Sequence, residues 1–167
     1  KRAKAAGMGV LATCHLGDTW TSPGNQAKPA AWADLDFAGL QKAVQQYVGD
    51  TTNALVDAGV TPEMIGVGNE TSDGVLFPDG RRSNGEKFAA LIQAGCSAVR
   101  AIDKNIQIML HHHLGRSNDV VVAWVDNFLA HNVDFDIIGM SCYNEAHPGD
   151  WKTNFDDLAV RYPHLSF

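Results

Sequence analysis

The 167-residue chain is long enough for one domain with a hydrophobic core, and 45% hydrophobic with 19% charged residues is typical of a globular protein. The 13 basic and 19 acidic residues give a formal net charge of -6, and no basic run occurs, which argues against a nucleic-acid partner. No apolar run reaches the ~18 residues that a membrane-spanning helix needs.

Strand-like and helical segments alternate from the start of the chain. A short helical end precedes the first expected strand at residues 8–15, and the glycine- and proline-rich stretch 16–33 predicts a long loop. From Asp34 apolar residues recur at three- and four-residue steps until Gly59, which predicts a helix with fraying near 49–50.

The second strand is expected at residues 64–68, where an apolar run stops at two polar residues. The helix after it is expected to start at Ser83, which has capping-box spacing to Glu86. A third strand is expected at residues 107–110 and runs into His111.

The second half of the chain repeats the alternation. A helix is expected to open at residues 117–119 and to end at Asn132, followed by a fourth strand at 135–140. The last helix is expected to be capped by Asp150 and ended by Pro163, after which the chain begins another strand.

Strand-helix alternation predicts parallel strands with crossover helices, in either a barrel of eight units or an open doubly wound sheet. The glycines 66 and 68 begin a dinucleotide-binding pattern, but Thr71 occupies its third glycine position. Long loops and polar residues follow the strands, which favours the barrel. We therefore expect one α/β domain over residues 1–167, a partial (β/α)8 TIM barrel covering about strands 3 to 6.

Glu70 is the strongest candidate catalytic residue. It follows an apolar strand, where partial burial favours the protonated carboxyl group that a general acid needs, and Asn69 beside it can hold a substrate hydroxyl. Hydrolysis of a bond between sugars needs two such carboxylates. Taken alone, this position is more often explained by a helix-capping or solvated glutamate.

Aromatic residues in the long loops, Trp20, Trp32 and Phe77, suit packing against sugar rings, although packing of the loops themselves is the alternative. The three cysteines, Cys14, Cys96 and Cys142, are odd in number and widely spaced. They predict neither a disulfide framework nor a zinc site, and we interpret them as buried thiols.

The run His111-His112-His113 could suggest a metal site. Alternate side chains of a strand point to opposite faces, so only His111 and His113 could share one, and no third ligand has suitable spacing. We expect no metal and no cofactor. Residues 69–71 also match an N-glycosylation sequon, which we interpret as chance because a glycan would fill the expected cleft.

Four stretches carry a family resemblance: KAAGMGVLATCHLGDTWTSPGNQAKPAAW, AGVTPEMIGVGNETSDGVLFPDG, IQIMLHHHLG and VDFDIIGMSCY. In this order and spacing, over essentially the whole chain, they resemble glycoside hydrolase family 53, the endo-β-1,4-galactanases. The resemblance implies a (β/α)8 barrel that hydrolyses β-1,4-galactan of pectin side chains with retention at the anomeric carbon.

Carried over position by position, the resemblance implies that Glu70 is the acid/base carboxylate and that Asn69 contacts the 2-hydroxyl of the sugar. It also implies that six residues in all line the substrate cleft: Asn69, His15, Asp18, Trp20, His111 and Tyr143. The chain departs from the family pattern at residues 112–113 and 142–144, which bears on the fine specificity.

The resemblance places the nucleophilic glutamate at the end of a seventh strand, beyond Phe167. The chain begins without methionine and resembles the central part of a longer protein. We expect the 167 residues alone to lack activity, because double displacement needs two carboxylates and the nearest spare, Glu145, lies in a loop. Open sheet edges should also make them prone to self-association.

Two alternatives remain open at this point. One is a related barrel glycosidase acting on mannan, xylan or glucan, and the other is a barrel piece that binds carbohydrate without cleaving it. A polymeric substrate cannot cross a membrane, so an extracellular location is expected. The oligomeric state is not predicted.

Overall fold

The structure, a computed structural model, describes residues 1–143 and 148–167. The elements in chain order are α1 (Arg2–Ala5), β1 (Leu11–Cys14), η1 (Ala30–Trp32), α2 (Phe37–Asp57), β2 (Met64–Val67), η2 (Thr71–Asp73), β3 (Gly74–Val75), β4 (Gly80–Arg81), α3 (Gly85–Ile102), β5 (Gln107–His112), α4 (Asn118–Ala130), β6 (Ile137–Met140) and α5 (Pro148–Arg161). The four predicted strands are present, and each is followed by one of the four long predicted helices.

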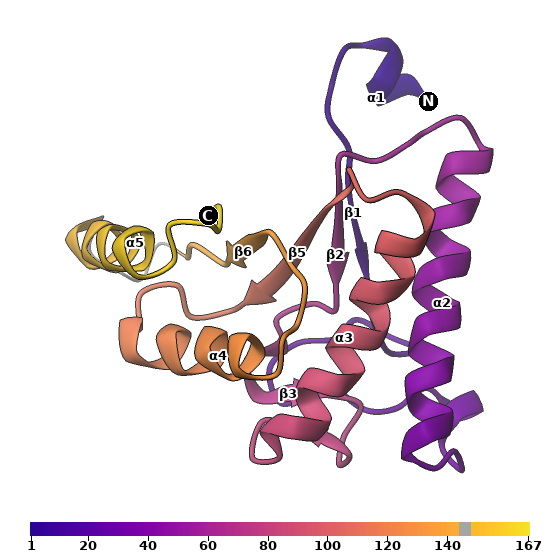
Figure 1. The fold of residues 1–167 in the computed structure, drawn as a ribbon, viewed down its shortest axis with the longest axis horizontal. Helices are drawn as coiled ribbons and strands as arrows, with labels where there is room; N and C mark the ends of the chain where they lie inside the picture. The colour runs from indigo at the N-terminus through magenta and orange to yellow at the C-terminus, as the bar shows by residue number, and fades with distance from the viewer. Residues whose placement is uncertain (144–147) are drawn as a thin grey trace.

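The main sheet has the strand order β1-β2-β5-β6, and every neighbouring pair is parallel. Each new strand is therefore added on the same side of the previous one, with no reversal of direction. A doubly wound sheet reverses its order at a switch point, whereas a barrel grows in one direction. The structure thus confirms the α/β fold with the arrangement of a partial barrel (Figure 1).

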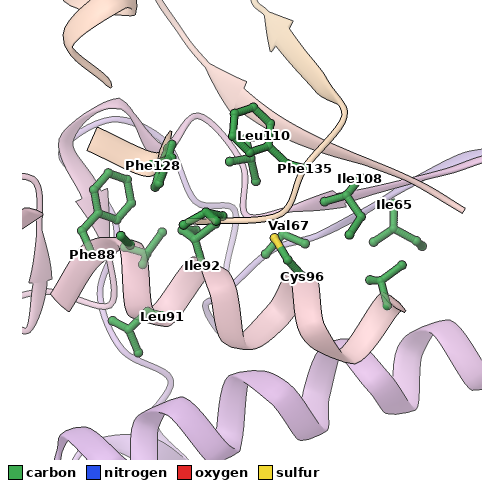
Figure 2. Close-up of a cluster of buried hydrophobic side chains, with 14 of the residues drawn as sticks. Ile65, Val67, Phe88, Leu91, Ile92, Cys96, Ile108, Leu110, Phe128 and Phe135 are labelled. Atoms are coloured by element: carbon green, nitrogen blue, oxygen red, sulfur yellow. The ribbon is translucent and has the colours of Figure 1, made fainter. Parts of the chain in front are cut away.

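The two faces of the sheet differ because side chains alternate along each strand. On one face, apolar side chains of β2 and β5 are completely buried against α3, as Figure 2 shows for Ile65, Val67, Ile108 and Leu110. The other face of β5 is only half-buried, as its burial pattern shows. In a barrel this second face points to the interior, so the helices lie outside it.

Met109 fills the space on the interior face over two strands. A Cβ atom added at Gly66 on β2 would lie 3.2 Å from the Met109 methyl carbon, and one added at Gly139 on β6 would lie 2.5 Å from its sulfur. The close approach of Met109 explains Gly139, and Met109 together with Thr13 of β1, whose hydroxyl would lie 2.9 Å from the added Cβ, explains Gly66. Met109 and these glycines form one layer of side-chain positions on the interior face. His111, two residues after Met109 on β5, points to the same face.

Several predicted details of the helices are wrong. Helix α2 runs unbroken through Gly49, on a turn that faces α3, where an added Cβ atom would lie 3.7 Å from the Ala98 methyl group. Helix α3 is capped by the side chain of Asn84, which accepts from the backbone N–H of Lys87, so the capping box predicted at Ser83 does not form. Asp150 lies inside α5 rather than at its cap.

The predicted burial of the cysteines holds for two of the three. Cys14 and Cys96 are buried in the core, but Cys142 is exposed because it follows the end of β6, outside the cover of the helices. The strand expected near the end of the chain is represented by a parallel bridge between Ser166 and Ile137.

Candidate active site

Polar side chains gather at the edge of the sheet where β2, β5 and β6 end. Asn69 and Glu70 follow β2, His111 lies near the end of β5, and Ser141 and Tyr143 follow β6. Parallel strands bring their carboxyl ends to one edge, so residues more than 70 positions apart in sequence meet there. His111 and Tyr143 therefore lie at the same edge of the sheet as Glu70, as predicted, and each of them contacts Glu70.

The backbone of Glu70 has a left-handed conformation, with φ 46° and ψ 54°. A residue with a side chain adopts it at a cost of about 1–2 kcal/mol, and such costs persist mainly at functional positions. The buried side chain of Gln26 stabilises this turn from below, because its amide nitrogen lies 2.9 Å from the carbonyl oxygen of Asn69 and 3.4 Å from that of Glu70.

The carboxyl group of Glu70 is almost completely buried, with 8% of the residue exposed. Its Oε1 accepts a hydrogen bond from Ser141 Oγ at 2.6 Å and another from Tyr143 OH at 2.9 Å. Oε2 has no hydrogen-bond partner among residues 1–143 and 148–167. One oxygen is therefore fixed by two hydroxyl groups, and the other is available to a reacting group.

Asn69 is held by both ends of its amide group. Its Nδ2 donates to the backbone carbonyl of Thr21 at 2.8 Å, which fixes the orientation of the side chain, and its Oδ1 lies 3.1 Å from His111 Nδ1. Asn69 is buried to 7% exposure. The buried, engaged amide supports the interpretation that the glycosylation sequon at this position is a chance match.

His111 contacts Asn69 through one ring nitrogen and Ser141 through the other, since Nε2 lies 2.9 Å from Ser141 Oγ. Burial lowers the pKa of His111, and the nearby Glu70 carboxylate opposes this in part, while His15 and His113 add to it. The imidazole is therefore neutral at neutral pH and can donate from only one nitrogen at a time.

His15 and Trp20 form the adjoining side of the site. His15 Nδ1 lies 3.2 Å from the backbone nitrogen and 3.0 Å from the hydroxyl of Thr21, the residue whose carbonyl also holds Asn69. Burial lowers the pKa of His15, with Glu70 acting in the opposite direction. The Trp20 ring packs 4.6 Å from the His15 ring and is 72% exposed, which leaves an aromatic surface open to a sugar.

Asp18 has a different environment from the other predicted site residues. Its Oδ2 accepts from the backbone N–H of Ala30 at 2.7 Å and so holds the long loop after β1 closed. It lines a cavity of about 200 Å³ together with His15 and Trp32. No direct contact joins it to Glu70 in the described structure, and a role in substrate binding stays a prediction.

The other loop aromatics are engaged in packing. Trp32 packs edge-on against Tyr47 at 6.1 Å, and the Arg81 guanidinium lies 4.1 Å over the ring of Phe77. Their environments match the alternative of loop packing. Glu145, the spare carboxylate considered above, lies outside the described residues.

The three consecutive histidines have three separate environments. His111 faces the site, His112 is buried on the helix side against Trp124, and His113 Nδ1 lies 2.5 Å from Ser72 Oγ. Within residues 1–143 and 148–167, no three His, Cys, Asp or Glu side chains lie close enough together to hold a metal ion. No helix in the described part of the chain is long and apolar enough to cross a membrane.

Three residues at the site escaped prediction as site residues. Ser141 carried a signal, because it is the first polar residue after the apolar strand β6, although a serine there is also a common loop residue. Gln26 and Thr21 carried none, because they act through a long loop whose path the sequence pattern does not determine.

Comparisons with known proteins agree with this geometry. The family model for glycosyl hydrolase family 53 matches residues 1–165. The chain is 38% identical over 97% of its length to a protein of Niallia circulans described as "Uncharacterized protein in bgaB 5'region", and covers 47% of that protein. It is 32% identical over 95% of its length to an arabinogalactan endo-β-1,4-galactanase of Thermothelomyces thermophilus, covering 51% of it.

Among solved structures, the catalytic domain of an Ignisphaera aggregans member of the same family superposes with a TM-score of 0.94 and 33% identity. The match covers 99% of the chain and 46% of that domain. The chain thus spans about half the length of the curated relatives it matches.

Proposed function

The chain belongs to glycosyl hydrolase family 53, and from this we propose that the protein carrying it is an endo-acting hydrolase of β-1,4-galactan in which Glu70 is the acid/base. The single observation that supports this role best is the buried Glu70 carboxyl group with one oxygen fixed by Ser141 and Tyr143. The names of related galactanases support the substrate, and a polymeric substrate supports an extracellular location.

The proposed reaction is a double displacement with retention. Glu70 donates the proton on its free oxygen to the glycosidic oxygen as the bond to C1 breaks, and a nucleophilic carboxylate about 5 Å away attacks C1. Glu70, now ionised, then takes a proton from water, which attacks C1 and releases the sugar. We propose that the nucleophile is a glutamate outside these 167 residues.

The remaining predicted residues serve as binding groups in this proposal. Asn69 accepts or donates to a sugar hydroxyl at the point of cleavage, and Trp20 supplies a flat apolar surface for a neighbouring ring. His111 and Tyr143 orient these groups, and His15 and Asp18 shape the loop beside them. Neither a cofactor nor a metal takes part in this mechanism.

The test is Glu70→Gln in the protein that carries these residues. Turnover of galactan should fall by ~10³-fold or more, because an amide keeps the shape of the side chain but cannot donate the proton. An aryl β-galactoside whose leaving group needs no proton should still react in the first step, seen as a burst of the released phenol.

Glu63→Gln is the matched control, because Glu63 precedes the same strand at its opposite, exposed end and pairs there with Lys4. It should keep wild-type turnover. If Glu70→Gln retained more than about a tenth of the wild-type rate on galactan, Glu70 could not be the general acid.

The wild-type protein should also be assayed on mannan, xylan and β-glucan. Faster release of sugars from one of these than from galactan would favour a related glycosidase. Binding of galactan without any cleavage would favour a carbohydrate-binding protein.

A further inference from the structure

Ser141 Oγ lies between the Glu70 carboxyl group, which can gain or lose a proton, and the His111 imidazole, which can have its proton on either nitrogen. It is 2.6 Å from Glu70 Oε1 and 2.9 Å from His111 Nε2. A serine hydroxyl has a single proton, so it can donate to one of these neighbours only and must accept from the other if both contacts are hydrogen bonds.

When Glu70 is ionised, its carboxylate only accepts hydrogen bonds, and the short contact directs the Ser141 proton to Oε1. Ser141 Oγ can then only accept from His111, which must have its proton on Nε2. The unprotonated Nδ1 faces the backbone N–H of Glu70 at 3.4 Å. In this state Nδ1 has no hydrogen, so Asn69 Oδ1 accepts no hydrogen bond from the ring.

When Glu70 is protonated on Oε2, the neutral carboxyl group is a weaker acceptor than the imidazole nitrogen. Ser141 then donates to His111 Nε2 and no longer to Oε1, which keeps its hydrogen bond from Tyr143. The ring then has its proton on Nδ1, which donates to Asn69 Oδ1 across 3.1 Å. The proton count balances: Glu70 gains one proton, and His111 keeps one, lost from Nε2 to solvent and regained at Nδ1.

We propose that Ser141 is a positioning residue that sets the tautomer of His111 according to whether Glu70 is protonated or ionised. The contacts run from Glu70 through Ser141 and His111 to Asn69. The amide of Asn69 cannot turn over, because its Nδ2 donates to Thr21, so its Oδ1 must face His111.

Burial keeps His111 in the required neutral form. Glu70, His15 and His113 are the groups that act on it through charge, and burial outweighs the attraction of Glu70 so that the pKa of His111 lies below its ordinary value. Tyr143 contacts Glu70 on the same oxygen as Ser141, and no bond between Tyr143 and His111 is present in the described structure.

The consequence for catalysis rests on the proposed function, whereas the tautomer itself does not. Once Glu70 has given up its proton, Asn69 Oδ1 is released by His111 and becomes free to accept a sugar hydroxyl. Ser141 thereby couples binding at the sugar to the protonation of the catalytic carboxyl group.

The experiment measures the ¹⁵N chemical shifts of both ring nitrogens of His111 at pH 7.5, assigned by their loss in His111→Gln. The wild type should show the proton on Nε2. Glu70→Gln, a neutral imitation of the protonated carboxyl group, should show it on Nδ1. The same tautomer in both proteins, whichever it is, would overturn the proposal.

Variants of the two hydroxyl groups separate a specific link from general support of Glu70. Ser141→Ala should move the proton to Nδ1 even with Glu70 ionised, and Ser141→Thr, which keeps the hydroxyl, should restore it to Nε2. Tyr143→Phe is the matched control, because it removes the other hydrogen bond to the same oxygen and should leave the proton on Nε2. A shift in Tyr143→Phe but not in Ser141→Ala would contradict the proposal.

Galactan turnover measured on the same samples keeps the two proposals apart. A wild type that shows the tautomer switch but does not cleave galactan would refute the proposed function and leave the role of Ser141 standing. A protein that cleaves galactan but whose His111 tautomer does not depend on Glu70 or Ser141 would support the proposed function and refute the role of Ser141.

Discussion

His111 and His112 are neighbours on one strand, yet the structure uses them in opposite ways. His111 points to the interior face, where both ring nitrogens contact polar groups of the site. His112 points to the helix side and is completely buried against the Trp124 ring. Its Nδ1 accepts from the backbone of Leu114, and its Nε2 has no partner in the described structure.

The difference shows that the alternation of a strand, rather than the residue type, decides between chemistry and packing. On the interior face a histidine finds hydroxyl and amide partners from β2 and β6. On the helix face the same residue type is surrounded by aromatic rings and stays neutral. Each of the following predictions tests one of these two faces.

The largest effect is expected on the helix side. Trp124→Ala removes a completely buried indole that contacts His112 and Phe128, and should lower the free energy of unfolding by about 3–5 kcal/mol. Chemical denaturation measures the loss. Trp20→Ala, the same substitution at an exposed position, should change it by less than about 0.5 kcal/mol. Equal losses in both would mean that the assigned faces are wrong.

A smaller effect, on activity rather than stability, is expected on the interior face. His111→Ala breaks the contacts to Asn69 and Ser141, and should lower turnover of galactan by ~10²-fold because the groups that hold sugar and carboxyl lose their alignment. His112→Phe should keep turnover close to that of the wild type. Steady-state kinetics of both variants measures the two effects. A large loss of turnover in His112→Phe and none in His111→Ala would mean that His112, and not His111, belongs to the site.

The smallest expected effect is on how the free energy of unfolding depends on pH. Burial, and secondarily the charges of His113, Arg82 and His111, lowers the pKa of His112 from 6.5 to about 3. Between these values the unfolded chain binds the proton and the folded chain does not, so the free energy of unfolding falls as the pH falls. From pH 6.5 to pH 5 the loss due to His112 should be on the order of 1–2 kcal/mol.

His112→Phe should remove this part of the pH dependence and leave that of the other histidines. Urea denaturation of wild type and variant at the two pH values measures it. A variant that loses stability with acid as steeply as the wild type would show that His112 does not contribute.

The sequence allowed the barrel and the ends of its strands to be predicted, because apolar runs that stop at polar residues mark both. Asn69, Glu70 and His111 were found in this way. The details that were wrong depend on contacts between distant parts of the chain. Gly49 weakens a helix in isolation, yet α2 is continuous because the helix as a whole packs along α3, and no local pattern reports that packing.

For the candidate site, the acid/base candidate and its neighbours were predictable, whereas the hydrogen bonds that connect them were not. Ser141 is 71 residues from Glu70 in sequence, and Gln26 is 44 residues away. Only the register of the parallel strands and the path of the loop after β1 bring them together. The same holds for His112, whose burial follows from the position of Trp124 on α4.

The layer below the site has a consequence for how the family can diverge. Met109 occupies the room that side chains at Gly66 and Gly139 would need, and the three positions lie on three neighbouring strands. The Cβ of an alanine at position 139 would lie 2.5 Å from the methionine sulfur, so a lineage that acquired it would have to move or shorten the side chain at residue 109. The order of substitutions is thus constrained, and relatives that differ here should differ at several of these positions together, with the small and the large residue exchanged between strands.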